Sequence, residues 1–349
     1  MMNYKETLFF IGKCLTINYE KHNKTIVEEK IKLDKVDWDN VVKLSTKHYV
    51  FPALYCNLKR ADFLHYLPSD LVEYMKHITD LNRQRNLKII EQAKEINDLL
   101  LKNNITPIFL KGTGNLLEGL YKDIAERMVG DIDFIVSKDE FQKTVLLLKE
   151  NNYKKTSDSL INPIISKHYP RLFNENKTAA VEIHLEMVRD KLSLSFNYNN
   201  VFKSILKKDN FSFLSYKDQL TLTILASQHN DFGSYYKNLS LRNTYDSYLL
   251  SRKTQTINNC TKKIFNLLNS YLAISSLVLN SHHIPYKNNL RVKIYYLIVI
   301  NKINYPIYNK VHSHFWKLYL YAYFKLRGLE RFLFNKEFRK YYIKKLSNS

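Results

Sequence analysis

The chain has 349 residues, of which 45% are hydrophobic, and it contains only seven glycines and seven prolines. This composition predicts a globular protein with a large core, and it excludes a disordered chain or one built from long flexible linkers. The net charge of +21 favours a polyanionic partner such as nucleic acid, or at least nucleotide phosphates.

The cysteines and the apolar runs indicate the compartment. Cys14, Cys56 and Cys260 lie far apart, and no pair has the spacing of a zinc or redox motif. We therefore expect a reduced, cytoplasmic protein without disulfides. The N-terminus lacks the features of a signal peptide, and the longest apolar run near the end, residues 294–300, is far shorter than the ~20 residues that cross a bilayer. The sequence accordingly predicts no membrane partner, and it leaves the oligomeric state open.

Helical periodicity dominates the first part of the chain. Asp37 is a candidate N-cap of a helix that turns Trp38 inward, and Pro52 suits the first turn of the next helix. We expect residues 1–80 to form a helical N-terminal cap. A broad apolar stripe then predicts a long helix over residues 81–104.

A short strand is predicted over residues 105–110, and the sequence Lys111-Gly112-Thr113-Gly114 follows it. A strand, a glycine turn and a helix in this order can cradle phosphate, because the free N–H groups of a helix start bind phosphate oxygens. Gly112 would let the backbone come close to such a ligand. The motif differs from the P-loop, and a plain turn is the alternative interpretation.

Two carboxylates begin the next strand, which is predicted over residues 130–136. Asp131 and Asp133 are two residues apart, so on a strand they point to the same side at a separation of roughly 6.5 Å. That spacing lets both reach one cluster of divalent ions, and paired ions are a standard means of moving nucleotidyl groups. Arg127 is interpreted either as a surface ion-pairing arginine or as one that holds carboxylates or triphosphate beside the site.

A hairpin over residues 169–184 is expected after a helix over 139–151. Glu182 and His184 share one face of its second strand. Glu182 is therefore the candidate third carboxylate, able to bind a metal ion on the acceptor side and to help deprotonate an attacking hydroxyl. The alternative is the solvated face of an edge hairpin. We expect His184 to support the site or contact the ligand.

Two further helices are predicted over residues 216–230 and 239–250. In the second, Arg242 and Asp246 have the spacing of a pair across one helical turn. Together with His229 they could face a nucleotide, and a structural role is the alternative.

The last sixth of the chain is strongly basic. Residues 291–349 contain 13 Lys or Arg against two Glu, a balance of +11 that is about half of the whole excess. Aromatic residues alternate with these cations, a pattern that suits RNA through phosphate neutralisation and base stacking. The alternative is a pair of amphipathic helices with core aromatics and solvated lysines.

Three of these motifs together resemble a known family: Lys111-Gly112, then Arg127-x-x-x-Asp131-Ile132-Asp133-Phe134, then Val181-Glu182-Ile183-His184. The pattern is similar to the uncharacterised nucleotidyltransferase family of the DNA polymerase β-like superfamily, which includes abortive-infection and toxin nucleotidyltransferases. The resemblance covers roughly residues 35–255. It departs from the superfamily in the turn, where Gly112-Thr113 replaces glycine-serine.

The resemblance implies an α+β fold, a polymerase-β-like mixed sheet flanked by helices. Residues 81–200 would be the nucleotidyltransferase catalytic core, and 201–349 a helical C-terminal domain with a basic aromatic tail. By motif, the catalytic and metal-binding residues are Asp131, Asp133 and Glu182, and the nucleotide-binding residues are Lys111, Gly112, Thr113, Arg127 and His184.

The implied reaction moves a nucleoside monophosphate from an NTP such as ATP to a hydroxyl acceptor. It would need two Mg²⁺ ions, with Mn²⁺ as an alternative, and release pyrophosphate. Through the basic tail, tRNA or another RNA is one acceptor, as for a toxin; a small molecule, sugar or protein side chain is another. A catalytically silent nucleotide- or RNA-binding regulator is the alternative of a different class. The acceptor and the preferred base stay open.

Overall fold

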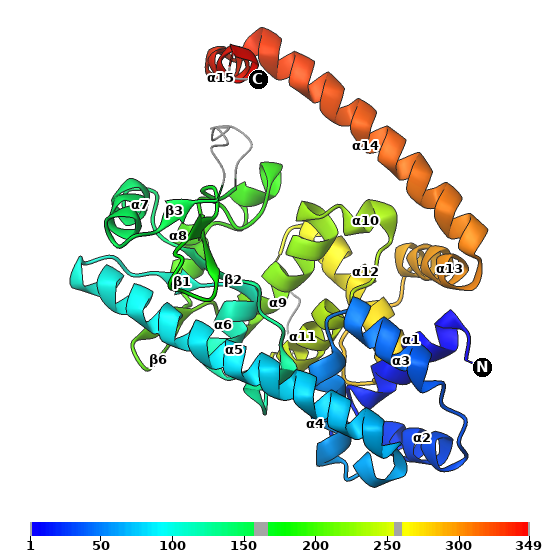
Figure 1. The fold of residues 1–349 in the computed structure, drawn as a ribbon. Coiled ribbons are helices and arrows are strands. Elements are labelled where there is room, and N and C mark those ends of the chain that lie inside the picture. The colour runs from blue at the N-terminus through cyan, green and yellow to red at the C-terminus, as the bar shows by residue number, and fades with distance from the viewer. Residues whose placement is uncertain (1, 157–166, 255–259, 348–349) are drawn as a thin grey trace.

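The computed structural model describes residues 2–156, 167–254 and 260–347, so residues 348–349 of the basic tail lie outside it. A mixed sheet occupies the middle of the chain, and helical regions precede and follow it (Figure 1). The expected α+β fold, a mixed sheet flanked by helices, is therefore confirmed.

The N-terminal region is a helical bundle. It consists of α1 (Tyr4–Cys14), α2 (Lys21–Lys32), α3 (Trp38–Lys47), α4 (Phe51–Arg60) and the short 3₁₀ helix η1 (Leu64–Tyr66). The side chains of Asn3 and Asp37 accept hydrogen bonds from backbone N–H groups in the first turns of α1 and α3. These caps satisfy donors that a helix start leaves free, which is why the helices begin there.

The long helix α5 (Ser69–Lys102) leads from this bundle to the sheet. It begins earlier than the helix predicted over 81–104 and runs unbroken through residue 80, so the three-part division of the chain stays a prediction. Two buried amides on α5 hold the segment that enters the central strand. Asn82 donates to the carbonyl of Ala125 (2.7 Å), and Asn86 donates to the carbonyl of Arg127 (2.8 Å).

The sheet has the strand order β3-β4-β5-β2-β1-β7-β6 within the described residues. Its central strand β2 is antiparallel to β1 and parallel to β5, and β1 is parallel to β7. The strands are β1 (Ile108–Phe109), β2 (Asp131–Ile135), β3 (Lys154–Lys155), β4 (Leu172–Phe173), β5 (Ala180–His184), β6 (Leu206–Lys208) and β7 (Phe211–Phe213).

Helices connect these strands. They are α6 (Lys111–Glu118), η2 (Ile124–Glu126), α7 (Phe141–Glu150), η3 (Asp190–Leu194) and α8 (Tyr198–Phe202). The strand predicted over 105–110 is reduced to the two residues of β1, and α6 begins directly after Leu110. Gly114 lets α6 lie against β1, since a Cβ there would be only 2.6 Å from the carbonyl oxygen of Phe109.

Strands β6 and β7 lie within the range 201–349 that was predicted as a helical domain, and from residue 216 on the regular elements of the described chain are helices. These helices are α9 (Tyr216–Leu225) with a π-helical continuation η4 (Ala226–Asn230), α10 (Gly233–Tyr236), α11 (Leu241–Ser251), α12 (Lys262–Leu279), α13 (Leu290–Asn304), α14 (Pro306–Phe334) and α15 (Lys336–Ser347). Helices α9 and α11 pack against each other. In the described residues, no helix is both long and apolar enough to cross a membrane.

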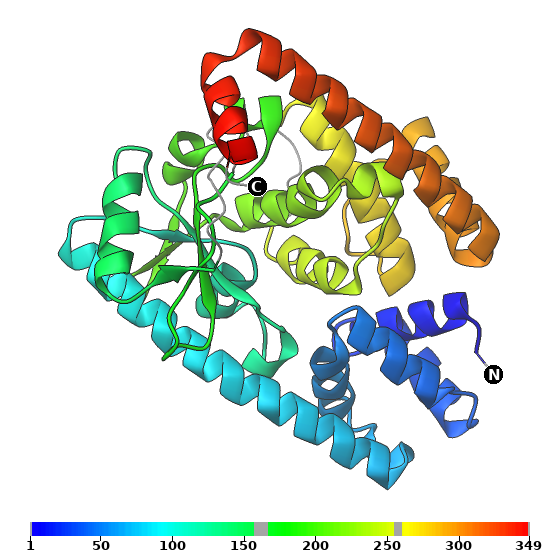
Figure 2. The ribbon, with the colours of Figure 1, turned by 45° about the horizontal axis from the view of Figure 1, so that its top comes forward.

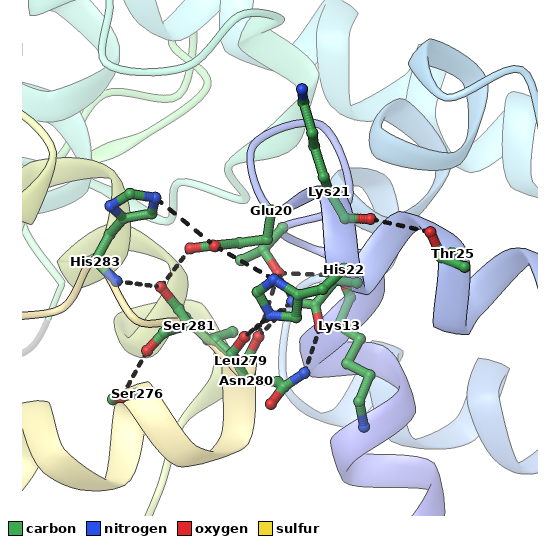
Figure 3. A network of polar contacts seen from close by, with 12 residues as sticks. Lys13, Glu20, Lys21, His22, Thr25, Ser276, Leu279, Asn280, Ser281 and His283 are labelled. Atoms are coloured by element: carbon green, nitrogen blue, oxygen red, sulfur yellow. Dashed lines mark hydrogen bonds and ion pairs between the residues drawn. The ribbon is translucent and has the colours of Figure 1, made fainter.

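A buried polar network fastens the N-terminal bundle to the end of α12 (Figure 3). Glu20, just before α2, accepts a hydrogen bond from the hydroxyl of Ser281. His22 donates from Nε2 to the carbonyl of Asn280 (2.6 Å). The buried carboxylate of Glu20 also accepts a hydrogen bond from the hydroxyl of Tyr248 (3.2 Å), so two hydroxyl donors offset its desolvation. The contacts of Ser281 and His22 hold together two segments that are far apart in sequence.

Candidate active site

Three carboxylates meet where β2 and β5 run side by side. The parallel register pairs Asp133 with Glu182 and Asp131 with Ala180. Side chains alternate along each strand, so Asp131, Asp133 and Glu182 project from one face of the sheet. Asp133 is 8% exposed and Glu182 is 6% exposed, whereas Asp131 is only partly buried. The structure thus brings together the three carboxylates that the sequence singled out.

Lys111 and His184 bind this carboxylate cluster. Lys111 has a left-handed backbone (φ 52°) at the start of α6, and its Nζ donates to Asp133 and lies 3.7 Å from Glu182 Oε2. The buried His184 has its Nε2 2.8 Å from Asp133 Oδ1. Ligand atoms of Asp133, Glu182 and His184 all lie within 4.8 Å of one another, and in the described chain this is the one such group that could hold a metal ion.

Arg171, which the sequence analysis did not single out, joins two of the carboxylates. Its Nη2 is 2.8 Å from Asp131 Oδ2, and its Nε is 2.8 Å from Glu182 Oε1. The signal lay in the hairpin register: Leu172 pairs with Val181, so Arg171 lies across from Glu182. An opposite-charge pair at facing positions of a hairpin is a recognised sheet interaction, but using it requires the register in advance.

The neighbouring cations and hydrogen bonds determine which carboxylates of the cluster stay ionised. Burial alone would raise the pKa of Asp133, but the Lys111 ammonium and the His184 hydrogen bond outweigh it and hold that pKa below its usual value. The pKa of Glu182 is lowered in the same way, against its burial, by His184, Lys111 and Arg171. Burial raises the pKa of Asp131, because Arg171 offsets only part of its effect. Asp133 and Glu182 therefore stay ionised beside a charged Lys111.

A cavity of about 440 Å³ opens in front of the carboxylates, between the sheet and helices α9 and α11. Lys167, Arg189 and Arg242 line it, and none of the three pairs with a carboxylate in the described residues. The Nε atoms of Arg189 and Arg242 are buried without a hydrogen-bond partner. The sequence pointed to Arg242 but not to Lys167 or Arg189. These two come from the segments before β4 and after β5, and they reach the cavity only in the folded chain.

Arg127 is buried and holds a carboxylate from the C-terminal region. Its Nε is 2.9 Å from Asp246 Oδ2 on α11, and Tyr121 donates to Asp246 Oδ1 (2.7 Å). Of the two interpretations, ion pairing is therefore observed, but inside the cavity wall and not at the surface. The predicted pair of Arg242 with Asp246 across one helical turn is not formed, since Asp246 has Arg127 and Tyr121 as its partners.

Gly112 and Thr113 position α6 against this site. A Cβ at Gly112 would lie 3.2 Å from Arg127 Nη2, so the glycine makes room for the guanidinium. The hydroxyl of Thr113 donates to the backbone carbonyl of Asp131 (2.7 Å). Both residues line the cavity, and their contact with a nucleotide stays a prediction.

Residues 34–279 match the model of a family described as "Uncharacterised nucleotidyltransferase". The match covers more than half of the chain and includes every residue placed in the cavity above. It ends with α12, so helices α13, α14 and α15 lie outside it. Comparisons with curated proteins and with solved structures found no match.

Proposed function

The chain belongs to the uncharacterised nucleotidyltransferase family, and from this premise we propose that it moves a nucleoside monophosphate from an NTP to a hydroxyl acceptor with Mg²⁺. The observation that carries the proposal is the register of β2 and β5, which puts Asp131, Asp133 and Glu182 on one face above a cavity lined by cations. The relation to the DNA polymerase β-like superfamily and its toxins, ATP as donor and a cytoplasmic location are parts of this proposal.

The donor atoms fit such an ion. Mg²⁺ prefers oxygen ligands, and three carboxylates supply them. Lys111 and Arg171 now offset the negative charge of these oxygens, which is the charge that divalent ions would offset when bound. We assign Asp131 and Asp133 to ions shared with the triphosphate and Glu182 to the acceptor side. His184, through its bond to Asp133, orients that carboxylate.

Bound Mg²⁺ or Mn²⁺ would neutralise phosphate charge and make the acceptor hydroxyl more acidic. In the proposed reaction the acceptor oxygen bonds to the α-phosphorus, the bond from that phosphorus to the bridging oxygen breaks, and pyrophosphate leaves. The hydroxyl proton passes to solvent, because the low pKa of Glu182, held down against burial by His184 and Lys111, makes this carboxylate a weak base.

The unpaired cations of the cavity suit the phosphates. Among the described residues, Lys167, Arg189 and Arg242 have no carboxylate partner, so they can bind the triphosphate and then the pyrophosphate without giving up an ion pair. Lys111 and Arg127 already pair with Asp133 and Asp246, so each could bind phosphate only if its charge were shared between the carboxylate and the phosphate. We therefore add these three cations to the nucleotide-binding set of Lys111, Gly112, Thr113, Arg127 and His184.

The test is NTP-dependent labelling of separate RNA, protein and small-molecule pools by the wild type and by Asp133→Asn. We expect transfer to fall by roughly 100-fold or more, the effect of removing one charge-stabilising group from an active site. Glu175→Gln, which neutralises an exposed carboxylate in the turn of the same hairpin, is the matched control and should label like the wild type. Equal labelling by Asp133→Asn would contradict the assignment.

The labelled pool also identifies the acceptor. RNA as the labelled product would support the toxin-like proposal, and a labelled sugar, other small molecule or protein would support the alternative. If no pool is labelled, thermal shifts with NTPs in the presence and absence of Mg²⁺ test the regulatory alternative, in which the carboxylate cluster binds nucleotide without turnover.

A further inference from the structure

Helix α14 carries an apolar stripe that nothing in the described part of the chain covers. Its members follow one another in steps of three or four residues, with Ala322 between the two halves, so they lie on one side of the helix. Each large side chain of this α14 stripe is between 56% and 67% exposed: Val311, Phe315, Leu318, Leu326, Leu329 and Leu333. The exposure contradicts the alternative in which the apolar residues of this segment are core.

The opposite side of α14 is the one that packs on the protein. Trp316 contacts Tyr235 with ring centroids 5.1 Å apart, and Phe324 contacts Phe232 at 5.3 Å. Leu320, between them in sequence, is buried. The helix is thus fastened by one side, and Figures 1 and 2 show it along the periphery of the molecule with its outer side free of other described elements.

Cations and tyrosines border the α14 stripe. Lys325 is exposed beside the stripe, and Lys310 and Lys317 are exposed further round the helix on the same flank, where they line a surface pocket with Tyr236. None of the three lysines is paired with a carboxylate in the described residues. Tyr321 is exposed on the same flank, and Tyr319 borders the other. Tyrosine rings with an apolar body and a polar tip favour the boundary between water and an apolar phase.

Two occupants fit this surface poorly. A second copy would bring two strongly basic segments together, since residues 291–349 carry a balance of +11. RNA would find cations and tyrosines, but five of the six large members of the stripe are aliphatic and offer neither a stacking surface nor a hydrogen bond. The occupant must be apolar and anionic at the same time.

We propose that α14 binds the surface of an anionic phospholipid membrane. The α14 stripe would lie at the boundary of headgroups and acyl chains, and Lys310, Lys317 and Lys325 would lie at the anionic headgroups. The prediction of no membrane partner considered only segments that span a bilayer, and an interfacial helix needs no such segment. The site goes beyond the proposed transfer reaction and requires neither NTP nor metal.

Vesicle flotation of the full-length protein tests the proposal. We expect it to float with phosphatidylcholine vesicles that contain phosphatidylglycerol and to stay unbound with phosphatidylcholine alone. Leu326→Glu/Leu329→Glu should lower the bound fraction at least ~10-fold, because it puts two charges on the side of α14 that would enter the membrane. Leu81→Glu/Leu87→Glu makes the same change at two exposed leucines of α5 and should bind like the wild type. Unchanged thermal unfolding of both double variants would show that they fold.

Several outcomes would overturn the proposal. They are no flotation with any vesicle, equal flotation of the stripe variant and the wild type, and equal binding to neutral and anionic vesicles. A lipid-free dimer that the stripe variant converts to a monomer would assign the surface to a second copy. A loss of RNA binding in the stripe variant, without vesicle binding by the wild type, would assign it to RNA. None of these results bears on nucleotidyl transfer, which the labelling assay measures separately.

Discussion

The guanidinium of Arg171 lies between Asp131 and Glu182, 2.8 Å from an oxygen of each. One side chain of the hairpin therefore links carboxylates on the two central strands. Its positive charge lowers the repulsion between these partly buried carboxylates. A bound divalent ion would lower the repulsion in the same way.

We expect Arg171→Gln to separate these two sources of positive charge. Without the guanidinium the metal-free protein should lose a few °C in Tm, because the carboxylates then repel each other. The gain in Tm on adding Mg²⁺ should be larger than in the wild type, since the ion no longer competes with Arg171. Thermal unfolding across a Mg²⁺ titration measures both effects, and the exposed Arg291→Gln serves as control. An unchanged response to Mg²⁺ would contradict competition at this site.

The buried ion pair of Arg127 with Asp246 predicts that losing the arginine alone lowers stability strongly, and that removing the aspartate as well restores most of it. Arg127→Met leaves the Asp246 carboxylate buried with Tyr121 as its remaining partner, which should cost about 3–5 kcal/mol in the free energy of unfolding. Arg127→Met/Asp246→Leu should recover most of that cost, because the uncompensated charge is gone. Urea unfolding of the two variants measures the difference. A double variant as unstable as the single one would mean that packing, and not charge, is responsible.

Gly12 allows helices α1 and α12 to approach closely. A Cβ at this position would overlap the backbone carbonyl of Val278, and backbone cannot move aside as a flexible side chain can. Gly12→Ala should therefore destabilise the protein by about 1–3 kcal/mol, the usual cost of overpacking. Gly328→Ala is the matched control on α14, where the added methyl meets open space. It should leave stability unchanged or raise it slightly, since alanine favours helix. Both are measured by denaturant unfolding.

His48 predicts a loss of stability in mild acid. Burial, with a smaller contribution from Lys47, lowers its pKa to about 4 in the folded protein, below the ordinary value near 6.5. Between pH 6.5 and pH 4 the imidazole is therefore protonated in the unfolded chain but neutral in the folded protein. The free energy of unfolding is thus highest above pH 6.5 and falls as the pH is lowered toward 4. His48→Asn, which keeps an acceptor for the N–H of Leu241, should flatten this dependence. Tm measured from pH 7 to pH 4 for both proteins checks it, and parallel curves would refute it.

The sequence anticipated most of the elements but not their limits. The hairpin, the strand of the two aspartates and the helices over 139–151 and 239–250 were predicted from local periodicity. A helix after the glycine turn was predicted, but its start at Lys111 was not, because the left-handed residue that begins it and the packing of Gly114 against Phe109 depend on tertiary contacts. The helix predicted over 81–104 extends back to Ser69, where Pro68 ends the preceding turn.

The carboxylates themselves were determined by the sequence alone. Asp131 with Asp133, and Glu182 with His184, share faces because side chains on a strand alternate with a period of two, which is a local property. The two pairs lie on the same face of the sheet because β2 and β5 pair in parallel with Asp133 opposite Glu182, and this pairing is known only from the structure. The partners Arg171 and Lys111 likewise come from a register and a helix start that no local pattern specifies.

The same division holds for α14. Alternating aromatics and cations were plain in the sequence, and an amphipathic helix was one interpretation of them. The position of Val311, Leu318 and Leu329 on one side follows from helical spacing once α14 is known to run unbroken from Pro306 to Phe334. Whether that side is core or surface was decided by tertiary packing, because Trp316 and Phe324 dock on the opposite side and leave the α14 stripe outside. Periodicity is a property of neighbours along the chain, whereas burial depends on which distant segments meet, and only the folded protein settles that.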